Sequence, residues 1–223
     1  MEKRVFLSPS DHGVGRNACL VANCWEDKHT RPIAAVCARH LARCGVTVKV
    51  ADADQTLAER CWASDEFGAT LHVPIHTNAF HDAEVRRLSL LFYEDDAEHR
   101  QLFDAIAPEL EAVYPGNKKA VYAVRRDLAE INSVKAPTVY CELGFHTNPT
   151  DCAEFIHNPE MVGKALAKGI CKALQEEWVE FIPAASGKLY RVQTFVGTRE
   201  GAENNAKALR AAGFDTYISE VEA

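Results

Sequence analysis

The chain has 223 residues, which suffices for one substantial domain and a small second unit. Its hydrophobic fraction of 47% and charged fraction of 26% are ordinary for a globular protein. The formal net charge is −7 and the basic residues are scattered, so nucleic-acid binding, which needs a basic stripe, is disfavoured. No apolar run approaches membrane-spanning length, so no membrane partner is expected.

The N-terminus offers a short apolar run, Val5-Phe6-Leu7, which we interpret as a first β-strand. The run is too short for the core of a signal peptide, and no small-residue cleavage site follows it. We therefore expect synthesis in the cytoplasm without a signal peptide, so that any action outside the cell requires release by another agent.

Strand and helix patterns alternate along residues 1–180, which predicts an α/β fold with a largely parallel twisted sheet and helices on both faces. Apolar residues recur at helical spacing on the last and longest of these segments, from Leu166 to Trp178. The predicted strands are 5–7, 46–50, 71–75, 88–93 and 138–143, and the predicted helices are 32–44, 57–64, 102–113 and 161–178.

The composition changes at 181–187, which reads as a linker after a main domain over 1–180. Residues 188–223 then predict a small β-α-β module with a strand, a helix closed by Gly213, and a second strand. About 35 residues are too few for a self-sufficient core, so this module should need a partner.

The chain has eight cysteines but no C-x-x-C pair, so a cysteine zinc knuckle is not expected. Several of them, including Cys37 and Cys141, lie on apolar helix or strand faces. We interpret the cysteines as reduced, buried thiols that behave as small hydrophobic side chains.

Three residues that could bind a metal or take part in catalysis lie inside, at the end of, or just after predicted strands. His76 ends the strand 71–75 and precedes a polar turn, and His12 follows the first strand within a glycine-containing loop. Glu142 lies inside the apolar strand 138–143, where a carboxylate is costly unless it is paired or near a metal. The carboxyl ends of strands in α/β sheets are where ligands bind, so the two histidines are candidate metal ligands and Glu142 a candidate general base.

Spacing alone leaves structural interpretations open for each of these residues. Most of the nine histidines are expected to be surface or structural, and Glu142 could be an acid paired with an arginine. Glu26 begins a charged segment, 26–29, whose simplest interpretation is a solvated helix entry.

Taken in order, five sequence blocks over roughly residues 4–178 resemble the family-3 N-acetylmuramoyl-L-alanine amidases, zinc enzymes of bacterial cell-wall turnover. The opening LSPSDHG resembles the family's strand followed by D-P-G-H-G-G, and Glu26 matches the family's metal-binding glutamate. The segment 54–60 resembles D-x-x-L-x-x-R, and IHTNA at 75–79 is close to S-I-H-x-N-A. The block PTVYCELGFHTNP at 137–149 is similar to the segment that carries the catalytic glutamate.

The resemblance implies one Zn²⁺ per chain, bound by His12, Glu26 and His76, with Glu142 as general base. It also implies bacterial peptidoglycan as the partner, cleaved at the amide between N-acetylmuramic acid and L-alanine. The opening block is one residue longer than the family's, which leaves Asp11 as a group that could assist the metal site. His146 stands where the family has an apolar residue and is the reserve ligand.

Residues 188–223 resemble one half of a SPOR domain, a peptidoglycan-binding module, through LYRVQTF at 189–195 and AAGFDTY at 211–217. A whole SPOR domain has two such halves, so we expect this half to pair with its copy in a second chain as a homodimer, or to be a truncated remnant.

Three functions remain open at this stage. The first is a wall amidase released by lysis or a holin, such as an endolysin or lytic autolysin. The second is another zinc peptidase or amidase on the same fold, and the third is an inactive wall-binding protein. Arg125 and Arg126, upstream of the Glu142 strand, are candidates for contacting stem-peptide carboxylates or else a solvated pair.

Overall fold

The computed structural model describes residues 2–10, 17–116, 118–180 and 203 of the chain. The chain divides into two compact units, Met1–Trp178 and Val179–Ala223. The predicted linker and β-α-β module, 181–223 apart from Glu203, lie outside the described residues, so the half-SPOR and dimer predictions stay predictions. Among the described helices, none has the length and apolar character needed to cross a bilayer.

The first unit is built on a six-stranded sheet with strand order β2-β1-β3-β6-β4-β5. Its neighbouring strands run parallel except β4 and β6, which pair antiparallel. The sheet is therefore mixed but largely parallel, as predicted. The strands are β1 (Arg4–Pro9), β2 (Thr47–Val50), β3 (Leu71–Asn78), β4 (Leu88–Phe92), β5 (Val121–Val124) and β6 (Tyr140–Phe145).

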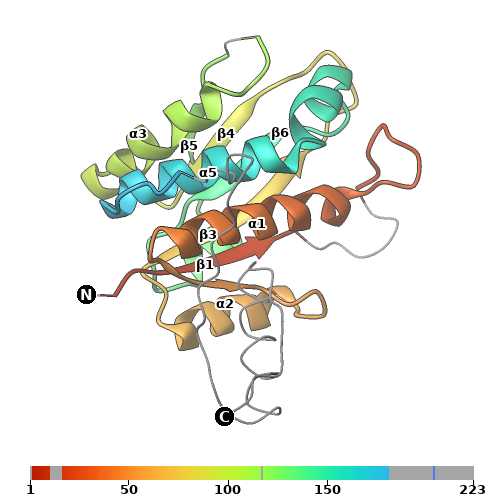
Figure 1. Cartoon of the computed structure of the whole chain (residues 1–223). Helices are drawn as coiled ribbons and strands as arrows, with labels where there is room; N and C mark the ends of the chain where they lie inside the picture. Colours follow the sequence, from red (N-terminus) through yellow and green to blue (C-terminus); the bar gives the residue numbers. More distant parts are fainter. Residues whose placement is uncertain (1, 11–16, 117, 181–202, 204–223) are drawn as a thin grey trace, which may run out of the picture. The chain divides into compact units, whose positions relative to one another are not determined.

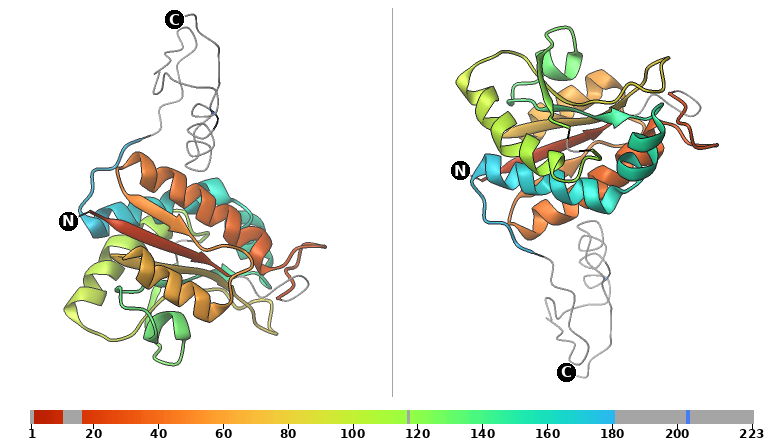
Figure 2. Two further views of the ribbon diagram at one scale, coloured as in Figure 1. Left: turned by 90° about the horizontal axis from the view of Figure 1, so that it is seen from below. Right: turned by 90° about the horizontal axis from the view of Figure 1, so that it is seen from above.

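Helices cover both faces of this sheet, which confirms the predicted α/β architecture. Helices α1, α3 and α5 lie on one face, and α2 lies on the other (Figures 1 and 2). The helical elements are α1 (Glu26–Arg43), α2 (Leu57–Phe67), α3 (Ala97–Glu111), α4 (Ala129–Asn132), the π-helix η1 (Asp151–Ile156) and α5 (Pro159–Leu174).

Strand alternation explains how one sheet supports two cores. In β1, Val5 and Leu7 are fully buried in the core beneath α1 and α5, whereas Phe6 packs on the opposite side with Ala63 of α2. Buried parallel strands of this kind read as continuous apolar runs because both faces are covered.

Helix α5 lies closely against its neighbours because two of its glycines face backbone. A Cβ added at Gly163 would lie 2.7 Å from the carbonyl oxygen of Ile33, and one at Gly169 would lie 2.7 Å from Cα of Ile106. Substitution at either position would push α5 away from α1 or α3, since interiors are close-packed.

Local signals fix the ends of α2. Thr56 accepts the amide hydrogen of Glu59, and the Glu59 carboxylate accepts that of Thr56, which forms a capping box. The helix ends at Gly68, whose φ of +67° is the left-handed conformation that glycine adopts readily. The predicted helix 57–64 is therefore correct but three residues short.

The structure corrects the start of α1, which the sequence placed at Pro32. The helix begins six residues earlier, at Glu26, and carries Pro32 inside it. The apolar residues at helical spacing begin only at Ile33, so the polar first turn carried no such pattern. Within this extra turn, Thr30 Oγ1 donates to the carbonyl of Glu26. Three short elements, β5, α4 and η1, were not predicted.

Candidate active site

His76 and Glu142 meet at the carboxyl-terminal ends of β3 and β6. The two residues are direct register neighbours on these parallel strands, so their side chains project from the same face of the sheet. The His76 ring also stacks on Tyr140, with ring centroids 4.5 Å apart and planes inclined by 18°. The sequence prediction that these two residues lie at one sheet edge is consistent with this register.

Glu26 lies against His76 and is not solvated. Its residue is only 1% exposed, so the interpretation of a solvated helix entry is wrong. Glu26 Oε1 is 3.2 Å from His76 Nδ1 and accepts the amide hydrogen of Thr77 at 2.9 Å. Oε2 accepts from Asn17 Nδ2 at 2.8 Å. As the first residue of α1, the carboxylate is also favoured by the positive end of the helix dipole.

A buried carboxylate that sequence analysis did not notice lies behind His76. Glu130 of α4 is 3% exposed, with Oε2 3.8 Å from His76 Nε2 and Oε1 3.4 Å from His72 Nε2. His72 Nδ1 in turn contacts Ser64 Oγ at 3.0 Å. The segment 129–132 has no pattern that marks a site, and only the folded chain brings Glu130 to the histidines.

Charge is concentrated around the His76 imidazole. Burial alone would lower the pKa of His76, but hydrogen bonding to Glu130 and Glu26 and the nearby charge of Glu142 raise that pKa to about 9. Burial would likewise raise the pKa of Glu130, but the imidazoles of His72 and His76 hold it well below its usual range. Three carboxylates around one imidazole make a place where a cation is stabilised.

The end of β6 shows why several residues of the 137–149 block are needed for the fold. Gly144 has a φ of +79°, and a Cβ there would lie 3.1 Å from Asp151 Oδ2. Asp151 is fully buried and accepts from the amide of Phe145 at 3.0 Å, the hydroxyl of Tyr114 at 2.7 Å and Nε of Arg86 at 2.8 Å. These bonds fix the chain that leaves the Glu142 strand.

Arg60, the last residue of the 54–60 block, has a structural role. It is 4% exposed and donates through Nη1 to the carbonyl of Pro9, the last residue of β1. Its Nε donates to the carbonyl of Gln55 at 3.1 Å. The guanidinium thus ties the end of β1, three residues before the predicted ligand His12 in the sequence, to the start of α2.

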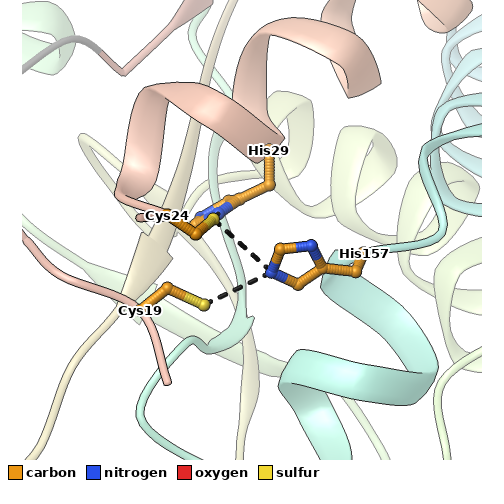
Figure 3. A group of neighbouring side chains, drawn as sticks. All are labelled: Cys19, Cys24, His29 and His157. Carbon is orange, nitrogen blue, oxygen red and sulfur yellow. Dashed lines mark hydrogen bonds between the residues drawn. The ribbon is translucent and has the colours of Figure 1, made fainter. Parts of the chain in front are cut away.

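A second group of side chains lies on the other side of β3, centred on Thr77. Thr77 Oγ1 is 2.7 Å from His29 Nε2 and 2.9 Å from His146 Nδ1. Beyond His29, four side chains converge, and their donor atoms all lie within 4.8 Å of one another (Figure 3): Cys19, Cys24, His29 and His157.

This second group was missed because only C-x-x-C spacings were considered. The two cysteines have C-x₄-C spacing, which still falls within the range of zinc ligands and could have found them. The prediction of reduced thiols is confirmed: all eight cysteines are free, and all except Cys19 are buried.

The remaining predicted residues have these positions. Asp11 and His12 lie outside the described residues. Arg125 is exposed and paired with Asp127, two hydrogen bonds of 2.7 Å joining them, while Arg126 lies 3.4 Å from Glu94. The hydrogen bonds to Asp127 raise the pKa of Arg125, and the nearby charge of Glu142 adds a smaller effect in the same direction.

Several solved structures share this fold. The structure matches N-acetylmuramoyl-L-alanine amidase AmiC2 of Nostoc punctiforme with a TM-score of 0.69 and 21% identity, over 78% of this chain and 97% of that one. It matches an N-acetylmuramoyl-L-alanine amidase from Clostridium difficile 630 with a TM-score of 0.69 and 17% identity, over 78% and 97%. It also matches the catalytic domain of the CD27L endolysin, which targets Clostridia difficile, with a TM-score of 0.60 and 20% identity, over 78% and 98%.

No curated protein sequence matches the chain. The family model described as N-acetylmuramoyl-L-alanine amidase, however, matches residues 7–176, which is well over half of the 223 residues. That span runs from within β1 to just past the end of α5 and includes Glu26, His76 and Glu142. The chain therefore belongs to the N-acetylmuramoyl-L-alanine amidase family, whose members hydrolyse an amide bond of bacterial peptidoglycan.

Proposed function

We propose that this amidase is zinc-dependent, with His12, Glu26 and His76 as the ligands of one catalytic Zn²⁺ and Glu142 as the general base. The bond cleaved is the amide between N-acetylmuramic acid and the L-alanine of the stem peptide. The observation that carries the proposal is the convergence of Glu26 and His76 beside Glu142 at the end of β3.

The donor atoms suit zinc. In a tetrahedral site with zinc–oxygen and zinc–nitrogen bonds of about 2.0–2.1 Å, two ligand atoms lie about 3.3 Å apart. Glu26 Oε1 and His76 Nδ1 are 3.2 Å apart. The Glu130 carboxylate on the Nε2 side of the ring leaves Nδ1 directed at Glu26, which is the usual way in which an outer carboxylate orients a histidine ligand.

The described residues on either side of the segment 11–16 support His12 as the third ligand. Ser10 donates its amide hydrogen to the carbonyl of Ile75, the residue before His76, at 2.8 Å. Asn17 donates to Glu26 Oε2. Both flanks of the segment thus adjoin the two ligands on which the proposal rests.

When bound, zinc would supply Lewis acidity for the scissile carbonyl and make water acidic enough to react near neutral pH. Glu142 lies next to His76 on the same face of the sheet, where it can take a proton from that water and deliver it to the leaving amine of L-alanine. Glu130 keeps its charge and holds the His76 ring in place. Tyr140, stacked on that ring, limits its rotation.

The test is digestion of purified sacculi followed by mass spectrometry of the new ends. New L-alanine amino termini support the proposal, and free D-alanine would instead indicate a carboxypeptidase. Sacculus binding without products would indicate an inactive wall-binding protein. Glu142→Ala should retain zinc and lose nearly all activity, whereas His76→Ala should lose the catalytic zinc.

We also propose a lytic role after release from the producing cell, as an endolysin or autolysin, and pairing of residues 188–223 between two chains. The first is supported by the similarity to an endolysin catalytic domain. The second rests on the SPOR-like sequence pattern alone. Light scattering at high concentration tests it, and a strictly monomeric protein would rule it out.

A further inference from the structure

Outside the catalytic cluster, the structure brings together two thiols and two imidazoles. We propose that Cys19, Cys24, His29 and His157 bind a second zinc ion, at a closed structural site on the opposite side of β3 from His76. The donor atoms of these four side chains lie within 4.8 Å of one another, and the side chains come from a loop, from α1 and from the end of η1 (Figure 3). The inference does not depend on the proposed function.

Three of the six distances between donor atoms match the edges of a tetrahedron around zinc. With zinc–sulfur bonds of about 2.3 Å and zinc–nitrogen bonds of about 2.0–2.1 Å, a sulfur and a nitrogen ligand lie about 3.5 Å apart. His157 Nε2 is 3.3 Å from Cys19 Sγ and 3.6 Å from Cys24 Sγ, and Cys24 Sγ is 3.8 Å from His29 Nδ1.

The fold builds the cysteine side of the site with a closed loop. Ala18 and Trp25 form an isolated antiparallel bridge, and the amide of Cys19 donates to the carbonyl of Cys24 at 3.0 Å. These contacts set the two thiols side by side immediately before α1. His29 follows Cys24 after one turn of that helix and is 3% exposed.

His157 reaches the loop because the segment before it is wound as a π-helix. The amide of His157 donates to the carbonyl of Cys152, five residues earlier, at 3.1 Å. Both side chains then contact Cys19 Sγ, Cys152 Sγ at 3.0 Å and His157 Nε2 at 3.3 Å. Single π-helical turns are rare in proteins, and a large share of those that occur lie at functional sites.

The hydrogen bond on the far side of His29 selects the ring nitrogen that faces the thiols. Nε2 is engaged by Thr77 Oγ1 at 2.7 Å, which directs Nδ1 at Cys24. A histidine that binds zinc usually has its other nitrogen held in this way. Two thiolates and two neutral imidazoles fill a tetrahedral coordination sphere, so the site has no open position and its role is structural.

The competing chemistry is a disulfide between Cys19 and Cys152. Their sulfur atoms are 3.0 Å apart, longer than the roughly 2.0 Å of a disulfide bond, and both cysteines are free. Oxidation would remove Cys19 from the metal site. Cys152 is therefore also the natural control, because it is a thiol at the same place that is not one of the four proposed ligands.

Metal analysis of the full chain, purified under reducing conditions, tests the proposal. Wild type should contain a second zinc beyond the catalytic one. Cys24→Ser should lose that second zinc alone, and His76→Ala should retain it. Cys152→Ser and Cys61→Ser, a buried thiol on α2, should keep the wild-type content. Loss of zinc in Cys152→Ser would overturn the ligand assignment.

Cobalt separates the two sites without any assay of activity. Co²⁺ bound by thiolates gives a charge-transfer band in the near ultraviolet, whereas the catalytic ligands offer only oxygen and nitrogen. The band should appear in wild type and His76→Ala and be absent in Cys24→Ser. A wild-type chain with no band, or with a Cys19–Cys152 disulfide under these reducing conditions, would overturn the second site.

A folding failure in Cys24→Ser would not remove the test. His157 is exposed, so His157→Ala leaves the core intact. It should weaken binding of Co²⁺ at the thiolate site by at least about tenfold, the loss that even an outer partner of a ligand causes. Unchanged cobalt affinity in a folded His157→Ala chain would contradict the proposal. Inactive protein with an intact thiolate band would count against the proposed catalytic site only.

Discussion

The two clusters on either side of β3 differ in their chemistry although consecutive residues anchor them. His76 projects into a group of carboxylates, Glu26, Glu130 and Glu142, while Thr77 projects toward imidazoles and thiols. Strand alternation makes this division possible. Glu26 Oε1 joins the two, since it contacts both His76 Nδ1 and the amide of Thr77. The three ligands proposed for the catalytic zinc leave it one open position for chemistry, whereas the four ligands proposed for the second zinc leave none.

The sharpest test of this division is removal of the proposed base. Glu142→Gln keeps the shape of the side chain but cannot accept the proton, so amide cleavage should fall by about 10²–10⁴-fold. Both proposed zinc ions should remain, because Glu142 is a ligand of neither. The measurement is the release rate of L-alanine amino termini together with metal content, and Glu66→Gln on the exposed face of α2 is the control. Near wild-type cleavage by Glu142→Gln would refute the mechanism.

The second test changes Glu130, which contacts the Nε2 side of the proposed ligand His76. Glu130→Gln removes the charge that holds the Nε2 side of His76, so zinc affinity or activity should fall by about 10–100-fold. The thiolate–cobalt band should be unchanged, since Glu130 lies on the other side of β3. Competition with a chelator measures the affinity. Equal affinity in the variant and wild type would show that Glu130 does not orient the ligand.

The third test disrupts the thiol cluster and measures the effect on stability and on cleavage at the catalytic cluster. Cys24→Ser should lower the melting temperature, because binding a metal to the folded state alone stabilises that state. Its effect on cleavage should be smaller than that of Glu130→Gln, since the connection runs through His29 and Thr77 to Glu26. Calorimetry with and without zinc checks the first point. A melting temperature that is insensitive to zinc in both chains would contradict it.

The smallest expected effect concerns the exposed arginines. If Arg125 contacts a stem-peptide carboxylate, Arg125→Ala should raise KM and leave kcat unchanged, since the interaction exists equally in the ground and transition states. Arg126→Ala, whose partner Glu94 lies elsewhere on the surface, is the comparison. If Arg125→Ala and wild type have equal KM, Arg125 does not contact the substrate, and Arg125 and Arg126 are a solvated pair of surface arginines.

Much of the cluster around His76 could be predicted from the sequence. His76 and Glu142 end or interrupt apolar strands, and strand ends gather at one edge of a parallel sheet, so position and chemistry agree. Glu26 depended on the family resemblance, because a charged segment at a helix start gives no sign that its first acid will be 1% exposed.

Glu130 and the second cluster could not be predicted in the same way. Glu130 lies on a helix of four residues, too short for any periodic signal, and it meets His76 only through the sheet. His157 is 133 residues from Cys24 and needs a π-helix to reach it. No single-sequence pattern distinguishes a π-helical turn from an α-helical one, because the difference is a single residue in the winding.

That difference gives η1 an evolutionary meaning. A π-helical turn holds one residue more than an α-helical turn, so deletion of a single codon within 151–156 would restore ordinary winding. His157 would then rotate by about 100° around the helix axis and leave Cys19. A lineage of these amidases could thus gain or lose the second metal in one mutational step, with every catalytic residue unchanged.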